Sequence, residues 1–203
     1  GGGPGRVVAP LDQRARQVLA QGRQVDASGV ARSDEVRQAL EVSVLAAHRH
    51  VFGVMLWFCV LEVLGLGPAG AVLYRQAEAL SRVWRRDAAA PERGVSAALA
   101  RAGGEAWGWI DWLPARATAL ALAIVGSFED AIDAWRRHAG QFANANDGVI
   151  LAAASGAVGV RLGSVPMRAP GPLAAGGPAE ALPGEAPSVA HFARVVGLVW
   201  RMV

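Results

Sequence analysis

From Ser33 onward, apolar residues recur at the three- and four-residue spacing of an amphipathic helix. Ser33 favours a helix N-cap, and Asp34 and Glu35 follow where carboxylates interact well with the positive end of the helix dipole. The apolar positions that follow lie on one helix face, at Val36, Leu40, Val44, Ala47 and Val51. We therefore expect a helix that begins at Ser33 and buries this face.

The segment Val51–Tyr74 is almost uniformly apolar and contains one charged residue, Glu62. A helix needs about 20 mostly apolar residues to cross a bilayer, and in this chain only this segment meets that length. Glycine and proline interrupt its second half and predict either one kinked span or two short membrane helices that meet at Gly65–Pro68. Glu62 would face a polar cavity or a partner, or lie at the interface if the helix ends near Leu61.

Three further apolar runs are too short to cross a bilayer alone: residues 117–128, residues 148–160 and the run that starts at Val189. Tryptophans of the kind found at membrane interfaces precede the first run, at Trp107, Trp109 and Trp112. The polar, alanine-rich residues 87–106 are expected to form a loop.

Local signals predict two helix starts. Asp111 can cap a helix that has Pro114 in its first turn, where a missing N–H costs little. Ser127 and Asp130 resemble a capping box, and Gly140 is expected to end the helix that they begin.

The composition favours a membrane-embedded helical protein. Of the 203 residues, 53% are hydrophobic and 18% are charged, against about 45–50% and about 25% in average soluble domains. The mean hydropathy is +0.28. All 20 basic residues are arginine and the net charge is +3, a surplus too small to indicate nucleic-acid binding. We expect an all-α fold, a polytopic or partly re-entrant membrane helical bundle, with a soluble all-helical domain as the alternative.

Four segments are expected along the chain. A polar N-terminal segment covers residues 1–32, a membrane helical core covers 33–163, and a proline- and glycine-rich linker covers 164–188. Residues 189–203 are interpreted as the start of a truncated membrane helix. Because the chain lacks an initiator methionine and ends inside an apolar run, we expect it to be the central part of a longer protein.

Few side chains suggest catalysis. In the triplet His48, Arg49 and His50, neighbouring residues do not face each other on a helix, so an interfacial cationic cluster is favoured over a metal site. Cys59, the one cysteine, is expected to be an inert packing residue. The sequence contains no dinucleotide-binding, Walker, zinc-protease or nucleophile-elbow motif.

Three ordered motifs resemble a known superfamily of integral membrane proteins. Trp109–Leu120 is similar to the (Asn/Asp)-Trp-x-Pro-(Ala/Val)-Arg-x-(Thr/Ala) motif of the CobD/CbiB and AmpE superfamily. Gly156–Gly163 resembles the Gly-Ala-Leu-Gly-Val-Arg-Leu-Gly motif of the CobD/CbiB branch, and Asn146 and Gly148 match the Asn-x-Gly before it. Gly67–Arg75 is similar to the Gly-Pro-x-Gly-Ala-x-x-Tyr-Arg turn of both branches.

This resemblance spans residues 36–163 and implies a bacterial inner-membrane protein with several spans. CobD/CbiB proteins are adenosylcobinamide-phosphate synthases, which attach an aminopropanol phosphate arm to cobyric acid late in cobalamin synthesis. AmpE proteins are inner-membrane proteins linked to signalling in β-lactamase induction. The resemblance therefore implies a role in late cobalamin biosynthesis, with a non-enzymatic AmpE-like signalling role as the alternative.

The chain departs from the synthase pattern at several positions. Ala46, Ala47 and His50 stand where the synthases have Glu-Asn-x-x-Asp, Asn144–Ala145 replaces a Ser-Pro pair, and Leu151 replaces an acidic residue. Carboxylates at such positions would bind Mg²⁺. Enzyme activity is therefore left open, and Mg²⁺ and ATP are implied as cofactors only if synthase activity is retained.

The predicted substrate-binding residues are Arg116, Arg161, Asn146 and Asp111. The planar fork of arginine suits phosphate and carboxamide oxygens. Asp111 is expected to orient Arg116 across the proline turn, or only to cap its helix. Membrane lipid and a corrinoid substrate are the expected partners, the bacterial inner membrane is the expected location, and the oligomeric state is left open.

Overall fold

The computed structural model describes residues 32–90, 92, 94–163 and 184–202, and this part of the chain is all-α, as predicted. Its first helix runs over Arg32–Val63 and includes a π-helical turn. In chain order the elements are η1 (His48–Phe52), α2 (Gly53–Val63), α3 (Ala69–Ala88), α4 (Ala97–Ile110), α5 (Trp112–Val125), α6 (Phe128–His138), the 3₁₀ turn η3 (Ala139–Gln141), α7 (Ala145–Val158) and α8 (Ala190–Met202). The segment predicted at residues 1–32 and most of the predicted linker lie outside the described residues.

The helix Arg32–Val63 is the one described helix that is long and apolar enough to cross a membrane, judged by length and composition. The helix start predicted at Ser33 stays a prediction, because Arg32 is the first residue that the structure describes here. The apolar window of this helix begins before the predicted Val51. Only 17% of that window is buried inside the protein. The helix ends at Val63, one residue after Glu62, which is exposed near the end of α2.

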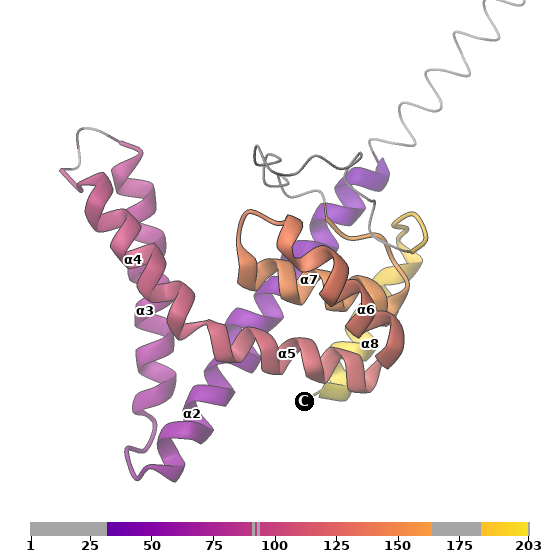
Figure 1. The fold of residues 1–203 in the computed structure, drawn as a ribbon, viewed down its shortest axis with the longest axis horizontal. Coiled ribbons are helices and arrows are strands. Elements are labelled where there is room, and N and C mark those ends of the chain that lie inside the picture. The colour runs from indigo at the N-terminus through magenta and orange to yellow at the C-terminus, as the bar shows by residue number, and fades with distance from the viewer. Residues whose placement is uncertain (1–31, 91, 93, 164–183, 203) are drawn as a thin grey trace, which may run out of the picture.

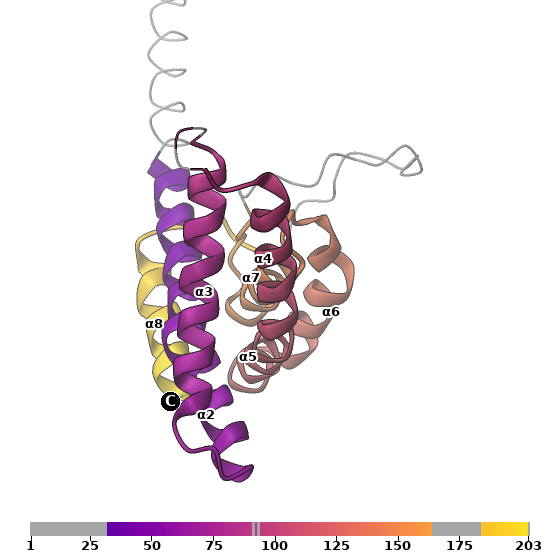
Figure 2. The same ribbon diagram turned by 90° about the vertical axis from the view of Figure 1, so that its left-hand side faces the viewer.

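The chain reverses direction after this helix and forms a hairpin. Gly65 and Gly67 have φ angles of 77° and 61°, which glycine adopts without steric cost. α3 then runs back beside α2 (Figures 1 and 2). A Cβ at Gly70 would overlap the Trp57 carbonyl, so glycine allows the two backbones to approach closely. The alternative of one kinked span is therefore wrong, and two helices meet at Gly65–Pro68.

The loop predicted over residues 87–106 is wrong, because Ala97–Ile110 forms α4. The hydroxyl of Ser96 caps this helix by accepting a hydrogen bond from the Leu99 N–H at 3.2 Å. Alanine favours a helix, and α3 supplies the surface on which α4 packs, with Gly103 against the Trp84 ring. Tertiary packing thus stabilises a helix where the polar composition of the segment favoured a loop.

The core centres on α7, which α5, α6 and α8 surround (Figure 1). Residues 148–156 of α7 are all buried, as expected for a helix that is apolar all round. Small residues let its neighbours approach: a Cβ at Gly156 would overlap the Asp130 carbonyl of α6. The run predicted over residues 148–160 is therefore helical as far as Val158, and most of it lies inside the protein.

α5 and α6 begin directly after Asp111 and Ser127, where helix starts are predicted, but neither side chain caps its helix by accepting a hydrogen bond from a backbone N–H. The Ser127 hydroxyl donates to Asp130 Oδ2 at 2.6 Å at the start of α6, and Gly140 lies in η3 just after its end. α8 begins one residue after the predicted Val189. Cys59 is exposed, so its predicted role as a packing residue is wrong.

Candidate functional site

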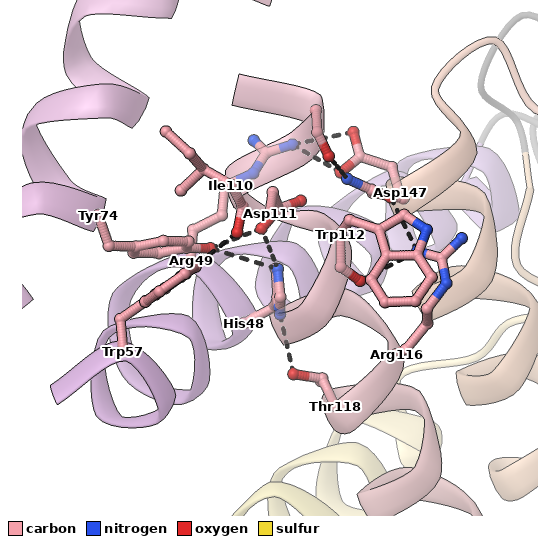
Figure 3. Close-up of polar contacts among 12 residues, drawn as sticks. His48, Arg49, Trp57, Tyr74, Ile110, Asp111, Trp112, Arg116, Thr118 and Asp147 are labelled. Atoms are coloured by element: carbon pink, nitrogen blue, oxygen red, sulfur yellow. Dashed lines mark hydrogen bonds and ion pairs between the residues drawn. The ribbon is translucent and has the colours of Figure 1, made fainter. Parts of the chain in front are cut away.

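The break between α4 and α5 is built around a proline. Pro114 has no N–H, so the Ile110 carbonyl, four residues earlier, lacks the donor that a continuous helix would supply. The indole Nε1–H of Trp57, on α2, donates to this carbonyl oxygen at 3.0 Å instead (Figure 3). A side chain of the first hairpin thereby satisfies the acceptor and helps to fix the point at which α5 leaves α4.

A buried polar cluster surrounds the same break, formed by His48, Tyr74, Asp111 and Thr118. Asp111 Oδ1 accepts a hydrogen bond from the Tyr74 hydroxyl at 2.7 Å and lies 2.9 Å from His48 Nε2. His48 Nδ1 lies 2.9 Å from the Thr118 hydroxyl. With the Nε2 proton directed at Asp111, Nδ1 can accept the hydroxyl proton of Thr118. The four side chains come from η1, α3, the break and α5, so they join these elements (Figure 3).

Tyr74 reaches this cluster because it passes over a glycine. A Cβ at Gly53 would overlap the Tyr74 ring and hydroxyl, so a larger residue would displace the tyrosine. Burial, and then the negative charge of Asp111, raise the pKa of Tyr74. The hydroxyl therefore stays protonated and keeps its role as a donor. The Tyr74 ring also packs on Trp107, with 5.0 Å between the ring centroids.

The residue after His48 reaches a different helix. Arg49 Nη2 lies 2.8 and 2.9 Å from the two carboxylate oxygens of Asp147, in the first turn of α7 (Figure 3). Asn144 caps this turn by accepting hydrogen bonds from the N–H groups of Asn146 and Asp147. The ion pair is partly buried, with 30% of the Arg49 side chain and 18% of the Asp147 side chain exposed. It ties the first helix to the N-terminus of α7.

Arg116 and Asn146 meet directly. Arg116 Nη1 donates to Asn146 Oδ1 at 3.2 Å and to the Trp112 carbonyl at 3.0 Å. Its guanidinium lies 4.1 Å above the Trp112 ring, a cation–π arrangement. Asn146 Nδ2 donates in turn to the Gly108 carbonyl at 3.0 Å. Burial lowers the pKa of Arg116 and the charge of Asp111 partly offsets this effect, but an arginine remains a cation.

These two residues line a cavity of about 510 Å³ between the α4–α5 break and the start of α7. The wall on α4 and α5 carries three tryptophans, Trp107, Trp109 and Trp112, together with Glu105 and Arg116; the other wall is residues 143–146, and Arg85 of α3 completes the lining. Such a cavity has the size of small-molecule sites and combines aromatic faces with cationic and amide donors. Its chemistry suits a ligand that presents anionic or carboxamide oxygens.

The predicted binding residues divide into three groups. The structure brings Arg116 and Asn146 together at the cavity. It places Asp111 behind the cavity, where its carboxylate bonds to His48 and Tyr74 and acts on Arg116 through its charge. It does not bring Arg161 to them: this guanidinium donates to the Gly184 carbonyl at 3.2 Å and is not among the residues that line the cavity.

The interpretation of residues 48–50 as an interfacial cationic cluster is wrong. His48 is fully buried and bonds to Asp111 and Thr118, while Arg49 pairs with Asp147. His50 alone is exposed, and its Nδ1 lies 2.8 Å from an arginine of α3. Helical spacing predicts that these neighbours point in different directions, but it does not reveal that the partners of His48 and Arg49 lie inside the protein.

Comparison with known proteins gives two relatives of the same name. The chain is 31% identical over 189 residues, 87% of its length and 52% of the relative's, to "Cobalamin biosynthesis protein CobD" of Stutzerimonas stutzeri (strain A1501). It is 36% identical over 141 residues, 70% of its length and 40% of the relative's, to the protein of that name in Chromobacterium violaceum. The chain belongs to the CobD/CbiB family.

The chain spans about half the length of the Stutzerimonas stutzeri protein and 40% of the length of the Chromobacterium violaceum protein. No family model and no solved structure matches it. These relatives give the AmpE-like alternative no support.

Several residues that position this cavity were missed from the sequence. Neither His48 nor Asp147 fills a defined position in the three motifs, and Trp57 gave no sign that it would donate to a distant carbonyl. Thr118 is the last residue of the motif around Pro114, but no contact with His48 was predicted for it. One available signal was Pro114: a proline inside a helical pattern leaves the carbonyl four residues earlier in need of a donor.

The cavity of this CobD/CbiB member does not fit Mg²⁺. Mg²⁺ prefers octahedral oxygen ligands with carboxylates among them. The cavity lining offers one carboxylate, Glu105, against the guanidinium groups of Arg85 and Arg116. Among the described residues no three His, Cys, Asp or Glu side chains group so that they could hold a metal ion.

Proposed function

We propose that this chain is part of a bacterial inner-membrane protein that acts in cobalamin biosynthesis and binds a corrinoid at the cavity beside the α4–α5 break. The observation that carries the proposal is the pairing of Arg116 with Asn146 at the cavity, thirty residues apart in the chain. The names of the two relatives support the pathway.

The chemistry of the cavity matches one edge of a corrinoid. A corrin ring carries carboxamide side arms, whose oxygens accept hydrogen bonds from a guanidinium and whose N–H groups donate to an amide oxygen. Arg116 and Asn146 supply both of these groups at the cavity, and Trp109, which is 79% exposed, offers a flat apolar face. Because the ring is larger than a cavity of about 510 Å³ can enclose, one edge or one side arm would enter it.

The membrane location rests on the first hairpin. Large apolar side chains near its tip are exposed, among them Val63 (87%), Leu64 (66%) and Leu66 (58%). A largely apolar exposed surface of this kind is unfavourable in water and favourable in lipid. We expect the full-length protein to sediment with membranes and to resist extraction by alkaline carbonate; release into the soluble fraction would contradict this location.

Complementation tests the proposed role. The full-length protein should restore corrinoid synthesis in a strain that lacks the CobD/CbiB synthase, and Arg116→Ala should reduce that restoration strongly. Arg161→Ala is the matched control, because it removes an arginine that bonds to a loop carbonyl and does not line the cavity. Failure of the wild-type protein to complement, despite normal expression, would contradict the role in this pathway.

A further inference from the structure

The π-helical turn η1 directs two consecutive side chains to the two walls of the cavity. Consecutive residues of a helix point about 100° apart, so neighbours can serve different elements. His48 bonds to Asp111, at the break between the wall helices α4 and α5. Arg49 bonds to Asp147, in the first turn of α7. Both walls are therefore attached to one short segment of the first helix.

The two attachment points are adjacent in sequence to residues that line the cavity. Asp111 precedes Trp112, and Asp147 follows Asn146. A shift of either carboxylate would therefore move a lining residue. Neither Asp111 nor Asp147 lines the cavity, so each can hold a wall without occupying the ligand space.

The two cavity walls need a connection that remains when a ligand binds. In the structure described here, the walls are also joined directly by the Arg116–Asn146 hydrogen bond, which is long at 3.2 Å. A ligand oxygen that accepts from Arg116 would compete with Asn146 for the same donor. The contacts of His48 and Arg49 do not involve Arg116, so they would persist after this exchange.

We propose that His48 and Arg49 are positioning residues: η1 sets the separation of the two cavity walls through the His48–Asp111 and Arg49–Asp147 contacts. The inference deepens the proposed function, since it concerns the same cavity, but its geometric part does not depend on the identity of the ligand. π-Helical turns within α-helices frequently lie at functional sites. This turn is defined by the Gly53 N–H bonding to the His48 carbonyl.

The test measures the distance between the walls in the full-length, cysteine-free protein, which requires Cys59→Ser in this chain. Spin labels are placed at Glu105→Cys on α4 and Ala145→Cys on α7, both exposed residues of the cavity lining. Pulsed dipolar spectroscopy should give a narrow distance distribution. Arg49→Met should broaden or shift it. Arg49→Lys should restore most of the original distribution, because a single nitrogen of Arg49 makes both contacts with Asp147 and an ammonium group can replace it.

Two comparisons separate positioning from general destabilisation. Asp147→Asn should reproduce the change, and combining it with Arg49→Met should add little, because both substitutions break the same ion pair. A second label pair, Arg86→Cys and Arg101→Cys on α3 and α4, reports a distance that does not cross the cavity. It should stay unchanged in every variant. His48→Gln is a further test of the other contact.

An unchanged wall-to-wall distribution in Arg49→Met and in Asp147→Asn would overturn the proposal, and so would equal broadening of both label pairs. Cobinamide serves as the ligand probe: Arg49→Met should raise its Kd about tenfold and Arg49→Lys should recover most of the loss, with the α3–α4 distance unchanged. If the wild-type protein binds no cobinamide while the distance changes still occur, the corrinoid function fails and the positioning role stands.

Discussion

The hydrogen bond from Trp57 to the Ile110 carbonyl should show energetic coupling to Pro114. Trp57→Phe keeps an aromatic ring but removes the Nε1–H, so the carbonyl loses its donor. Leaving a buried acceptor unsatisfied costs about 1–3 kcal/mol. Because Ile110 is only partly buried, we expect the low end, about 1 kcal/mol. For a chain of this length such a loss lowers the melting temperature by about 2–4 °C.

The double-mutant cycle with Pro114→Ala isolates this contribution. Alanine at position 114 has an N–H that can bond to the Ile110 carbonyl, as in a continuous helix. Trp57→Phe also loses packing around the indole ring, and Pro114→Ala leaves a small cavity. Each of these free-energy costs is the same with and without the other substitution, so both cancel in the cycle. Trp57→Phe should therefore cost about 1 kcal/mol less in the Pro114→Ala background than in the wild type.

Thermal unfolding followed by far-ultraviolet circular dichroism provides the measurement. Trp84→Phe is the matched control, since this tryptophan is also half-buried in the hairpin region but lies against Gly103. Its cost should be the same in the wild type and in the Pro114→Ala background. Equal costs of Trp57→Phe in both backgrounds would refute the argument that the indole replaces the donor that proline lacks.

The buried cluster gives three further predictions. Tyr74, the only tyrosine of this chain, should show no tyrosinate absorbance near pH 10, where a free tyrosine ionises. Its contribution to the free energy of unfolding should be fully present below that pH and should be lost as the pH rises above it. Reversible ionisation near pH 10 without loss of structure would contradict this prediction. Gly53→Ala should destabilise the protein by about 1–3 kcal/mol, measured by chemical unfolding, because the new methyl group displaces Tyr74; an effect under about 0.5 kcal/mol would count against it. Thr118→Val should cost about 1 kcal/mol in the same assay, since it removes the hydroxyl at His48 Nδ1, and no change would show that this contact contributes nothing.

The sequence predicted those parts of the fold that depend on local signals. The glycines around Pro68 and the Ser127–Asp130 pair each act within one or two turns, so the hairpin and the start of α6 could be inferred. The helix α4 was missed because its stability comes from packing on α3, which no local pattern contains. Charge and hydropathy alone favoured a loop there.

The site was predicted only where a motif marked it. Arg116, Asn146 and Arg161 were predicted to bind a ligand, and the structure brings only the first two together. His48 was misinterpreted because its burial depends on Asp111 and Thr118, 63 and 70 residues further along the chain, and no local pattern contains these contacts. Asp111 was expected to orient Arg116, but its carboxylate forms hydrogen bonds with Tyr74 and His48 instead.

The central claim is that a corrinoid binds where Arg116 and Asn146 meet. The direct measurement is the affinity of the full-length protein for cobinamide, followed by its visible absorbance. Loss of a charged hydrogen bond costs about 1.5–3 kcal/mol, so Arg116→Ala should raise the Kd about 10- to 100-fold. Arg161→Ala should leave it unchanged, because Arg161 lies apart from the cavity. Equal affinities of the wild type and Arg116→Ala would contradict the claim.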